Sequence, residues 1–317
     1  MTREPRRSLW LRLALPALAS SFALMPGVAS SQQAQAPGFS AGLGARTWFT
    51  TGYTTWSFQG SGIDPLSELR LRGTDSLIGE ANADLVWKRF VLMTSVGGGA
   101  ITDGVLIDDD FDRSGHQARS SHTRSSVDDD GVFYFNIDAG WRLVNWGLPG
   151  STLPGYLDVF VGYQRWEETY EAFGITGTPP TASTGTKVIT QEYTWDSLRV
   201  GGRIHIPMSE RLAVHTRAVV LPYTRTRLDD VHHLRTDLQQ NPSFSSEADG
   251  GLGVQLDFGL LYTVWRGLAV EGGYQFWRID SGSGDKFTHG IGGTTKDELN
   301  EIVVERGGPY VGLRYRF

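Results

Sequence analysis

Cysteine is absent from the 317-residue sequence, which excludes disulfide bonds and thiolate metal ligands. Long apolar runs are also missing after residue 30, so no later segment is suited to form a membrane-spanning helix. Positive charge is scarce as well: without residues 1–30 the chain has 25 basic and 34 acidic residues, which argues against nucleic-acid binding. The sequence is rich in glycine, with 40 residues, and only 39% hydrophobic. This composition fits strands that are apolar on one face only.

The last eight residues show such a strand most clearly. They read YVGLRYRF and alternate between an apolar face and a polar one. The apolar face carries Val311, Leu313, Tyr315 and Phe317, and the other carries Tyr310, Gly312, Arg314 and Arg316. A period of two with arginine on one side is typical of a strand between lipid and a wet barrel interior.

Similar segments occur throughout the chain and predict an all-β protein, a ten-stranded antiparallel transmembrane β-barrel. Their number is even, as expected for a bacterial outer-membrane barrel, and closure leaves no unpaired edge in the hydrocarbon. The predicted strands are residues 41–58, 66–87, 90–106, 131–144, 156–172, 188–206, 211–228, 249–265, 268–282 and 300–317.

Charged residues within these strands are predicted to face the barrel interior. A basic residue on the lipid face costs about 2 to 4 kcal/mol at the bilayer midplane. We therefore expect ion pairs inside the barrel among Asp138, Arg142, Asp158, Glu271, Arg314 and Arg316.

The amino terminus predicts export. Four arginines precede a short apolar stretch from Leu13 to Met25, and small residues follow, as in a secretory signal peptide. We expect residues 1–30 to be the signal peptide, with cleavage between residues 29 and 36, and residues 37–317 to be a single barrel domain. The predicted location is the bacterial outer membrane.

The connections alternate in length. Short turns are predicted at 88–89, 145–155, 207–210 and 265–267, and long polar loops at 59–65, 107–131, 172–187, 229–248 and 281–299. Because short turns are periplasmic in such barrels, all five long loops are expected on the extracellular rim. Strands of about 18 residues, tilted by about 40°, rise roughly 45 Å, well beyond an apolar band of about 25 Å.

Three polar constellations lie near the predicted outer rim. Asp108 and Asp110 are two residues apart on an extended segment, so they point the same way and raise each other's pKa. Asp230 and His232 have the same spacing, in which a carboxylate orients an imidazole for base catalysis. Ser120 and His122 form the third pair. Solvated loop charges would give the same patterns, and a calcium site is an alternative for the acidic cluster, although the spacing of an EF-hand is missing.

With these motifs in this order, the chain resembles the omptin family of outer-membrane endopeptidases. The family's Asp-x-Asp pair is similar to Asp108 and Asp110, its Asp-x-His couple to Asp230 and His232, and its Ser-x-His segment to Ser120 and His122. Looser similarity is found at residues 67–69, residues 162–164 and the terminal strand. The resemblance implies a water held between the Asp pair and His232, with His232 as general base oriented by Asp230. Ser120 and His122 would be supporting groups.

The resemblance implies no metal and no organic cofactor, a polypeptide substrate, a monomeric barrel, and lipopolysaccharide as an activating lipid. Candidates for lipid contact, by position near the outer rim, are Arg165, Lys187, Arg225 and Arg227.

The sequence departs from the family in the residues that confer specificity. Omptins recognise basic residues through acidic groups, but Leu228 occupies the position two before Asp230, and residues 38–62 contain no acid. Asp109 and Asp229 are possible substitutes. Two other functions stay open: a non-catalytic barrel acting as an adhesin or surface structural protein, and a small-solute channel, which ten strands disfavour because side chains fill so narrow an interior.

Overall fold

The protein is described here from a computed structural model that places residues 38–128, 130–148 and 153–317. The predicted signal peptide, residues 1–30, lies outside the described residues and stays a prediction. In the part of the chain that is described, no helix is long and apolar enough to cross a membrane.

The described residues form twelve strand segments, and all the pairings between them are antiparallel. They are β1 (Phe39–Gly60), β2 (Ile63–Trp87), β3 (Phe90–Arg113), β4 (Gln117–Val127), β5 (Asp130–Gly147), β6 (Pro154–Gly177), β7 (Ala182–Pro207), β8 (Leu212–His232), β9 (Phe244–Trp265), β10 (Leu268–Asp280), β11 (Gly284–Gly290) and β12 (Gly293–Arg316).

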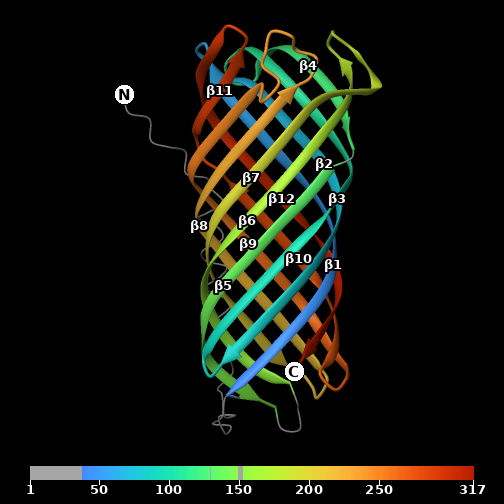
Figure 1. Ribbon diagram of the computed structural model, residues 1–317, viewed down its shortest axis with the longest axis vertical. Helices are drawn as coiled ribbons and strands as arrows, with labels where there is room; N and C mark the ends of the chain where they lie inside the picture. The colour runs from blue at the N-terminus through green and yellow to red at the C-terminus, as the bar shows by residue number, and fades with distance from the viewer. Residues whose placement is uncertain (1–37, 129, 149–152) are drawn as a thin grey trace.

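These segments make a closed ring of ten strands (Figure 1). β4 and β5 both pair with β3 and β6, one above the other, so they are two parts of one strand. β10 and β11 are related in the same way between β9 and β12. β1 pairs with β12 and closes the ring. The predicted ten-stranded antiparallel barrel is therefore confirmed.

The predicted long polar loops are mostly strand, although residues 233–243, between β8 and β9, do form a long connection. Residues 59–65 form a two-residue turn between β1 and β2, and most of residues 107–131 belong to β3, β4 and β5. Strand pairing satisfies backbone groups whatever the polarity of the side chains, so polar segments extend the wall instead of leaving it. The uninterrupted strands have 21 to 26 residues and form a tall cylinder. Its end with turns 88–89, 208–211 and 266–267 is called the lower end, and the opposite end the upper end.

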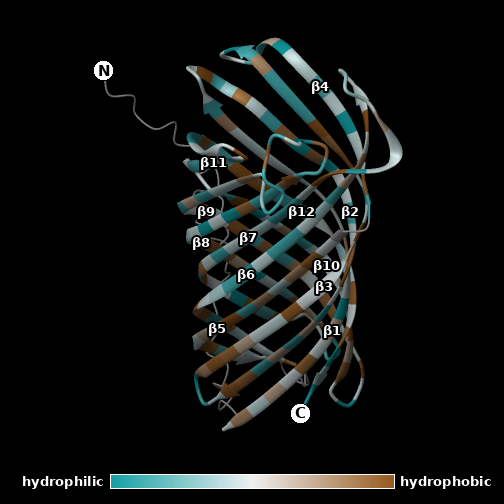
Figure 2. Cartoon of the chain, turned by 45° about the horizontal axis from the view of Figure 1, so that its top comes forward, coloured by the Kyte–Doolittle hydropathy of each residue, from teal (hydrophilic) through white to brown (hydrophobic). Residues whose placement is uncertain are grey.

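The outer surface of the lower half is apolar (Figure 2). The terminal strand follows its predicted alternation: Val311 and Leu313 are more than half exposed, whereas Tyr310 is buried. Equivalent exposed apolar residues occur on every neighbouring strand, for example Leu77, Ile137, Val161, Leu198, Leu256 and Val270. This apolar belt has the character of a surface that contacts lipid tails.

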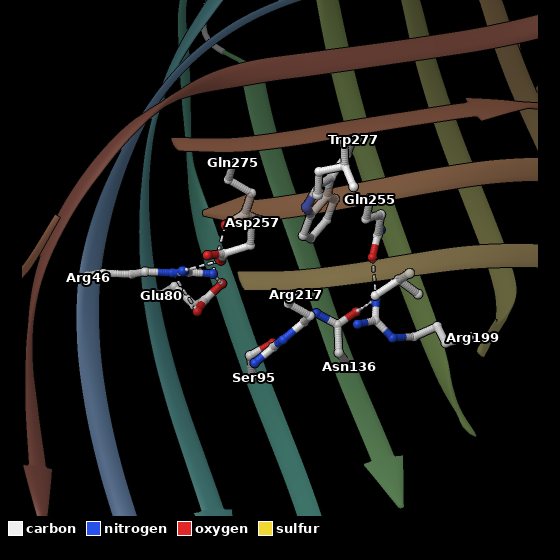
Figure 3. A pocket seen from close by; sticks show the side chains of 12 residues that line it. Arg46, Glu80, Ser95, Asn136, Arg199, Arg217, Gln255, Asp257, Gln275 and Trp277 are labelled. Carbon is white, nitrogen blue, oxygen red and sulfur yellow. Dashed lines mark hydrogen bonds and ion pairs between the residues drawn. The ribbon is translucent and has the colours of Figure 1, made fainter. Parts of the chain in front are cut away.

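The interior of the lower half is filled with paired charges, as the sequence predicted. Arg142 and Arg203 both bind Asp158, Arg199 binds Asp138, and Arg314 binds Asp84. Arg46 reaches Glu80, Asp257 and Gln275, which come from three different strands (Figure 3). Glu271 and Arg316 also line the interior, and no ion-pair partner lies within 4 Å of either among the described residues. We call this region the lower lumen.

An aromatic layer closes the lower lumen from above. Trp277 contacts Trp48, Tyr134 and Trp166, with ring centroids 4.6 to 5.4 Å apart, and all four side chains are buried. Three cavities inside the lower lumen have volumes of about 10 to 30 Å³, enough for roughly one water each, and a fourth of about 280 Å³ lies at the lower end beside Arg314 and Arg316. These dimensions do not favour a solute channel. The space above the layer is called the upper interior.

Candidate active site

A bulge in β3 turns the first predicted pair toward the inside. Below it the odd-numbered residues of β3, such as Val91, are buried, and above it the even-numbered ones are, such as Leu106. The register with β2 shifts between these positions, around Asp103. One extra residue in a strand exchanges its two faces. Asp108 and Asp110 therefore share the inner face with Leu106, as their spacing predicted.

A second bulge does the same for β8. Val219 and Leu221 are buried below it, and the even-numbered residues Thr224, Leu228 and Asp230 are fully buried above it. The register with β9 shifts between Leu221 and Thr224, at the Pro222-Tyr223 step. Proline cannot donate to the sheet and is commonly placed at such irregular positions. The bulge brings Asp230 and His232 to the inner face, where both predicted pairs now lie.

Asp230 and His232 form a buried ion pair. Nε2 of His232 lies 3.3 Å from Oδ1 of Asp230, and the two side chains are 17% and 0% exposed. The backbone N–H of His232 donates to Oγ of Ser243, which fixes the end of β8. Burial alone would lower the pKa of His232, but the charges of Asp230 and, more weakly, Asp108 raise it above its usual value. The imidazole is thereby made a stronger base.

Asp108 faces this ion pair across the upper interior. Its pKa is raised to about 7, mainly by burial and then by repulsion from Asp110, while the charge of His232 opposes the rise. Such a carboxyl holds a proton over part of the neutral pH range. The charges of Asp108, Asp230 and His232 act on one another's pKa, so the inner faces of β3 and β8 bring the two predicted pairs within electrostatic range of each other.

Three polar atoms at this place are buried without a hydrogen-bond partner among the described residues: Oδ1 of Asp108, Oδ1 of Asp230 and Nε2 of His232. The contact between the last two has ion-pair distance but lacks the alignment of a hydrogen bond. Buried polar atoms are normally hydrogen-bonded, and exceptions concentrate where a ligand or water binds. The arrangement is suited to hold a small polar molecule between carboxylates and a base.

The surroundings of the pairs are largely apolar and include Lys286, which is ion-paired with Asp297 at 3.4 Å. Phe244 packs edge-on against the imidazole of His232, with centroids 4.9 Å apart. Nζ of Lys286 lies 4.7 Å from the centroid of the Phe244 ring and 3.8 Å from that of Phe58. Leu228 is fully buried in the core below. The polar pairs therefore lie against aromatic side chains. Among the described residues around them, no further carboxylate is free to bind a basic group.

In the third predicted pair, His122 points elsewhere. Asp109 and His122 are paired across β3 and β4, on the wall face opposite to Asp108, with Nδ1 of His122 2.6 Å from Oδ1 of Asp109. Ser120 lies at a register shift of β4, between Ser121, which pairs with Asp110, and Arg119, which pairs with Phe111, so its spacing from His122 does not assign it to a face. His122 is not brought to the Asp pair, and a supporting role of Ser120 stays a prediction.

The possible substitute acids also face outward. Asp109 is bound by Arg70 and Arg119 in addition to His122, so its charge is already neutralised. Asp229 alternates with the buried Leu228 and Asp230 and lies on the outer face of β8. Neither residue supplies negative charge to the upper interior.

The four predicted lipid-contact cations are all engaged by carboxylates. Arg165 pairs with Glu167 and Asp196, and Lys187 with Glu171. Arg225 and Arg227 share Glu247. The pairing on β6 to β9 places a ladder of alternating charges above the apolar belt.

Comparison with known proteins establishes the barrel fold. The crystal structure of the outer membrane protease OmpT from Escherichia coli is similar with a TM-score of 0.72, at 13% sequence identity, over 91% of this chain and 99% of that chain. The translocator domain of the autotransporter NalP from Neisseria meningitidis matches over 97% of this chain and 95% of that one, with 11% identity and a TM-score of only 0.36. No family model and no curated protein matches the sequence. The fold is thus that of an OmpT-like outer-membrane barrel.

Sequence reasoning missed Gln191, Phe244 and Lys286, which contact the predicted pairs or each other. None of them belongs to a short motif, because each comes from a different strand. In the sequence they differ from other strand residues only by their inward position. That position cannot be read from the alternation, because bulges exchange the two faces of a strand.

Proposed function

We propose that this protein is an omptin-like endopeptidase of the bacterial outer membrane that hydrolyses peptide bonds with an activated water. One observation carries the proposal: two distant strands bring Asp108 and the Asp230–His232 ion pair together around buried polar atoms that lack partners. Interior charges that serve stability alone are normally paired, as are Asp138, Asp158 and their arginines in the lower lumen.

In the proposed reaction, a water lies between the Asp108/Asp110 side and the imidazole of His232. His232 takes one proton from this water as the oxygen attacks the scissile carbonyl carbon, and Asp230 orients and stabilises the resulting imidazolium. The Asp pair positions the water and shares its remaining proton. When the C–N bond breaks, the imidazolium returns its proton to the leaving amine, and the new carboxyl end carries the oxygen of the water.

The proposed setting follows from the outer surface. The apolar belt spans the hydrophobic layer, and the upper end, with the site, stands outside the cell. The charged ladder with Arg165, Arg225 and Arg227 lies where lipopolysaccharide headgroups begin, so these side chains are the proposed lipid contacts. A monomeric barrel is sufficient for this arrangement, since every strand is paired within one chain.

The proposed substrate is a polypeptide without a requirement for basic residues. Acids that would select lysine or arginine are replaced or face outward, and the cation nearest to Phe244 is Lys286. Neutral side chains of the peptide substrate are the better match for the aromatic residues Phe58 and Phe244.

A peptide-library assay with refolded protein and lipopolysaccharide tests the proposal. Native protein is expected to cleave a subset of peptides, and His232→Ala to cleave none of them. His233→Ala is the matched control, because His233 is the next residue and bonds only Thr190 at the surface. Equal cleavage by native protein and His232→Ala, or cleavage by neither, would overturn the assignment.

A further inference from the structure

Asp230 is bound on two sides. One carboxylate oxygen, Oδ1, faces His232, and the other, Oδ2, accepts a hydrogen bond of 2.9 Å from Nε2 of Gln191 on β7. Within the described chain, Gln191 is the only side chain other than His232 that contacts this carboxylate. The amide therefore decides how the carboxylate is rotated toward the imidazole.

The direction of this hydrogen bond is fixed by its surroundings. Oε1 of Gln191 accepts from the hydroxyl of Tyr193, at 3.2 Å, which leaves the NH₂ group for the carboxylate. Reversing the amide would place its oxygen against a carboxylate oxygen. Tyr193 is itself held by stacking on Trp195, with centroids 5.4 Å apart and planes 4° from parallel. A rigid chain thus runs from the aromatic core to Asp230.

This chain is buried throughout. Gln191, Tyr193 and Asp230 are 1%, 2% and 0% exposed. A buried amide or carboxylate is costly unless it is hydrogen-bonded, and hydrogen bonds to a charged group are stronger than those between neutral groups. Apolar side chains would fill the same space on β7 at lower cost, as Trp195 does four residues away. The glutamine is therefore best explained by what it does to Asp230.

We propose that Gln191 is a positioning residue, which holds Asp230 in the orientation that supports His232, with Tyr193 holding Gln191 in turn. The kinetic consequences of this inference rest on the proposed hydrolytic function. The orientation of Asp230 by Gln191 does not depend on that function. Gln191 touches no reacting atom; it acts through Asp230.

Several charged groups surround His232 and set the background of any pH experiment. From its own strand and the following turn come Asp230, His233 and Arg235, and from other strands come Asp108, Asp110 and Lys286. All of these stay unchanged in the variants below, so a shift in the titration of His232 reports on residue 191.

The test compares Gln191→Met, which keeps the size but loses the donor, with Gln191→Glu, which keeps the shape and adds a carboxyl. For Gln191→Met we expect kcat to fall about tenfold or more with little change in KM, and the titration of His232 to move to lower pH. For Gln191→Glu the added negative charge moves that titration to higher pH. In each variant, the acid limb of the pH–rate profile is expected to shift in the same direction as the titration of His232.

Gln164→Met is the matched control. Gln164 is also a fully buried amide on a neighbouring strand, but it bonds Gln255 in the lower lumen. Its replacement is expected to lower stability without moving the pH profile. A merely structural role for Gln191 would give the same result for Gln191→Met as for Gln164→Met.

The titration of His232 is measured by NMR on histidine-labelled protein, with His232→Ala to assign the signal, so the answer does not depend on catalysis. Opposite shifts in the Met and Glu variants support the positioning role even when no peptide is cleaved, in which case only the hydrolytic function fails. Unchanged titration in both folded variants overturns the inference, whatever the activity of the native protein.

Discussion

The carboxylates of the lower lumen and those of the Asp108–Asp110 pair in the upper interior differ in whether a cation is bound to them. In the lower lumen, Asp158 is bound by two arginines and Asp138 by Arg199 in bidentate contact, so each carboxylate has a cation of its own. In the upper interior, Asp108 faces another carboxyl, Asp110, and keeps a buried oxygen without a partner. The first arrangement stabilises the barrel, whereas the second keeps titratable groups near neutrality.

The aromatic layer separates these two regions. Below it, paired charges fill an interior that must not face lipid, and above it apolar side chains take over the core. The upper interior still holds a fully buried ion pair, Arg306 with Glu168, whereas Asp108, Asp230 and His232 each keep a buried atom without a hydrogen-bond partner among the described residues. Buried atoms without a hydrogen-bond partner occur in both regions, for example on Arg203 and His215 below; the upper interior differs because three of them belong to carboxyl groups and an imidazole that act on one another's pKa. The four predictions below test this contrast, beginning with the largest effect.

Asp230→Asn should abolish peptide hydrolysis while the barrel stays folded. An amide orients the imidazole poorly and does not stabilise its charged form, so kcat/KM is expected to fall by about a thousandfold or more. Cleavage kinetics of a library-selected peptide measure this, with heat-modifiable electrophoretic migration as the check on folding. Loss of activity that merely tracks loss of folded barrel would contradict the proposed role.

Asp158→Ala should act on stability instead. It leaves Arg142 and Arg203 with an uncompensated charge in the lower lumen, which costs about 3 to 5 kcal/mol of unfolding free energy. Denaturant unfolding in lipid vesicles measures the loss, and Asp237→Ala, at an exposed pair with Arg235, is the control with an effect near zero. Reduced hydrolysis per folded molecule would break the contrast between the two regions.

Asp108→Asn should alter the pH dependence of stability. The pKa of Asp108 is raised from its unfolded value to about 7, so its contribution to stability is fully present below about pH 4 and is lost as the pH rises through 7. The variant cannot ionise and is expected to be more stable than the native protein at pH 8.5, by roughly 2 kcal/mol given the partial exposure, and similar to it at pH 4. A stability difference that is independent of pH speaks against the raised pKa.

Lys286→Gln should have the smallest effect and act on specificity. Removing this cation beside Phe244 is expected to improve cleavage of peptides with a basic residue near the scissile bond by about three- to tenfold, and to leave neutral peptides unchanged. Lys296→Gln, at an exposed pair with Asp285, is the control. Equal changes for basic and neutral peptides would show that Lys286 supports the fold only.

Much of the fold could be predicted from the sequence because lipid enforces a strict alternation. The terminal strand with Val311 and Leu313 outside is one case, and the interior pair of Arg142 with Asp158 is another. Loop lengths could not be predicted, since polar strands above the belt no longer alternate against lipid and look like loops. The hairpin of β3 and β4 is the main example.

The site could be predicted in part. Spacing alone predicts that Asp108 points the same way as Asp110, and Asp230 the same way as His232. Nothing in the sequence shows that a bulge in each strand turns these residues inward. Ser120 and His122 have the same spacing, yet His122 lies on the outer face of β4 beside Asp109, and the register of β4 shifts at Ser120. A period of two predicts that two side chains agree in direction; it does not predict which direction that is.

The central claim is that Asp108 on β3 and His232 on β8 act on the same water. The most direct test is a double-mutant cycle in which kcat/KM is measured for Asp108→Asn, His232→Ala and the combination of both. Groups that act as a unit give strongly non-additive losses, so the double variant is expected to be about as impaired as the worse single variant. Losses that multiply, or a double variant that still cleaves at the native rate, would contradict the account.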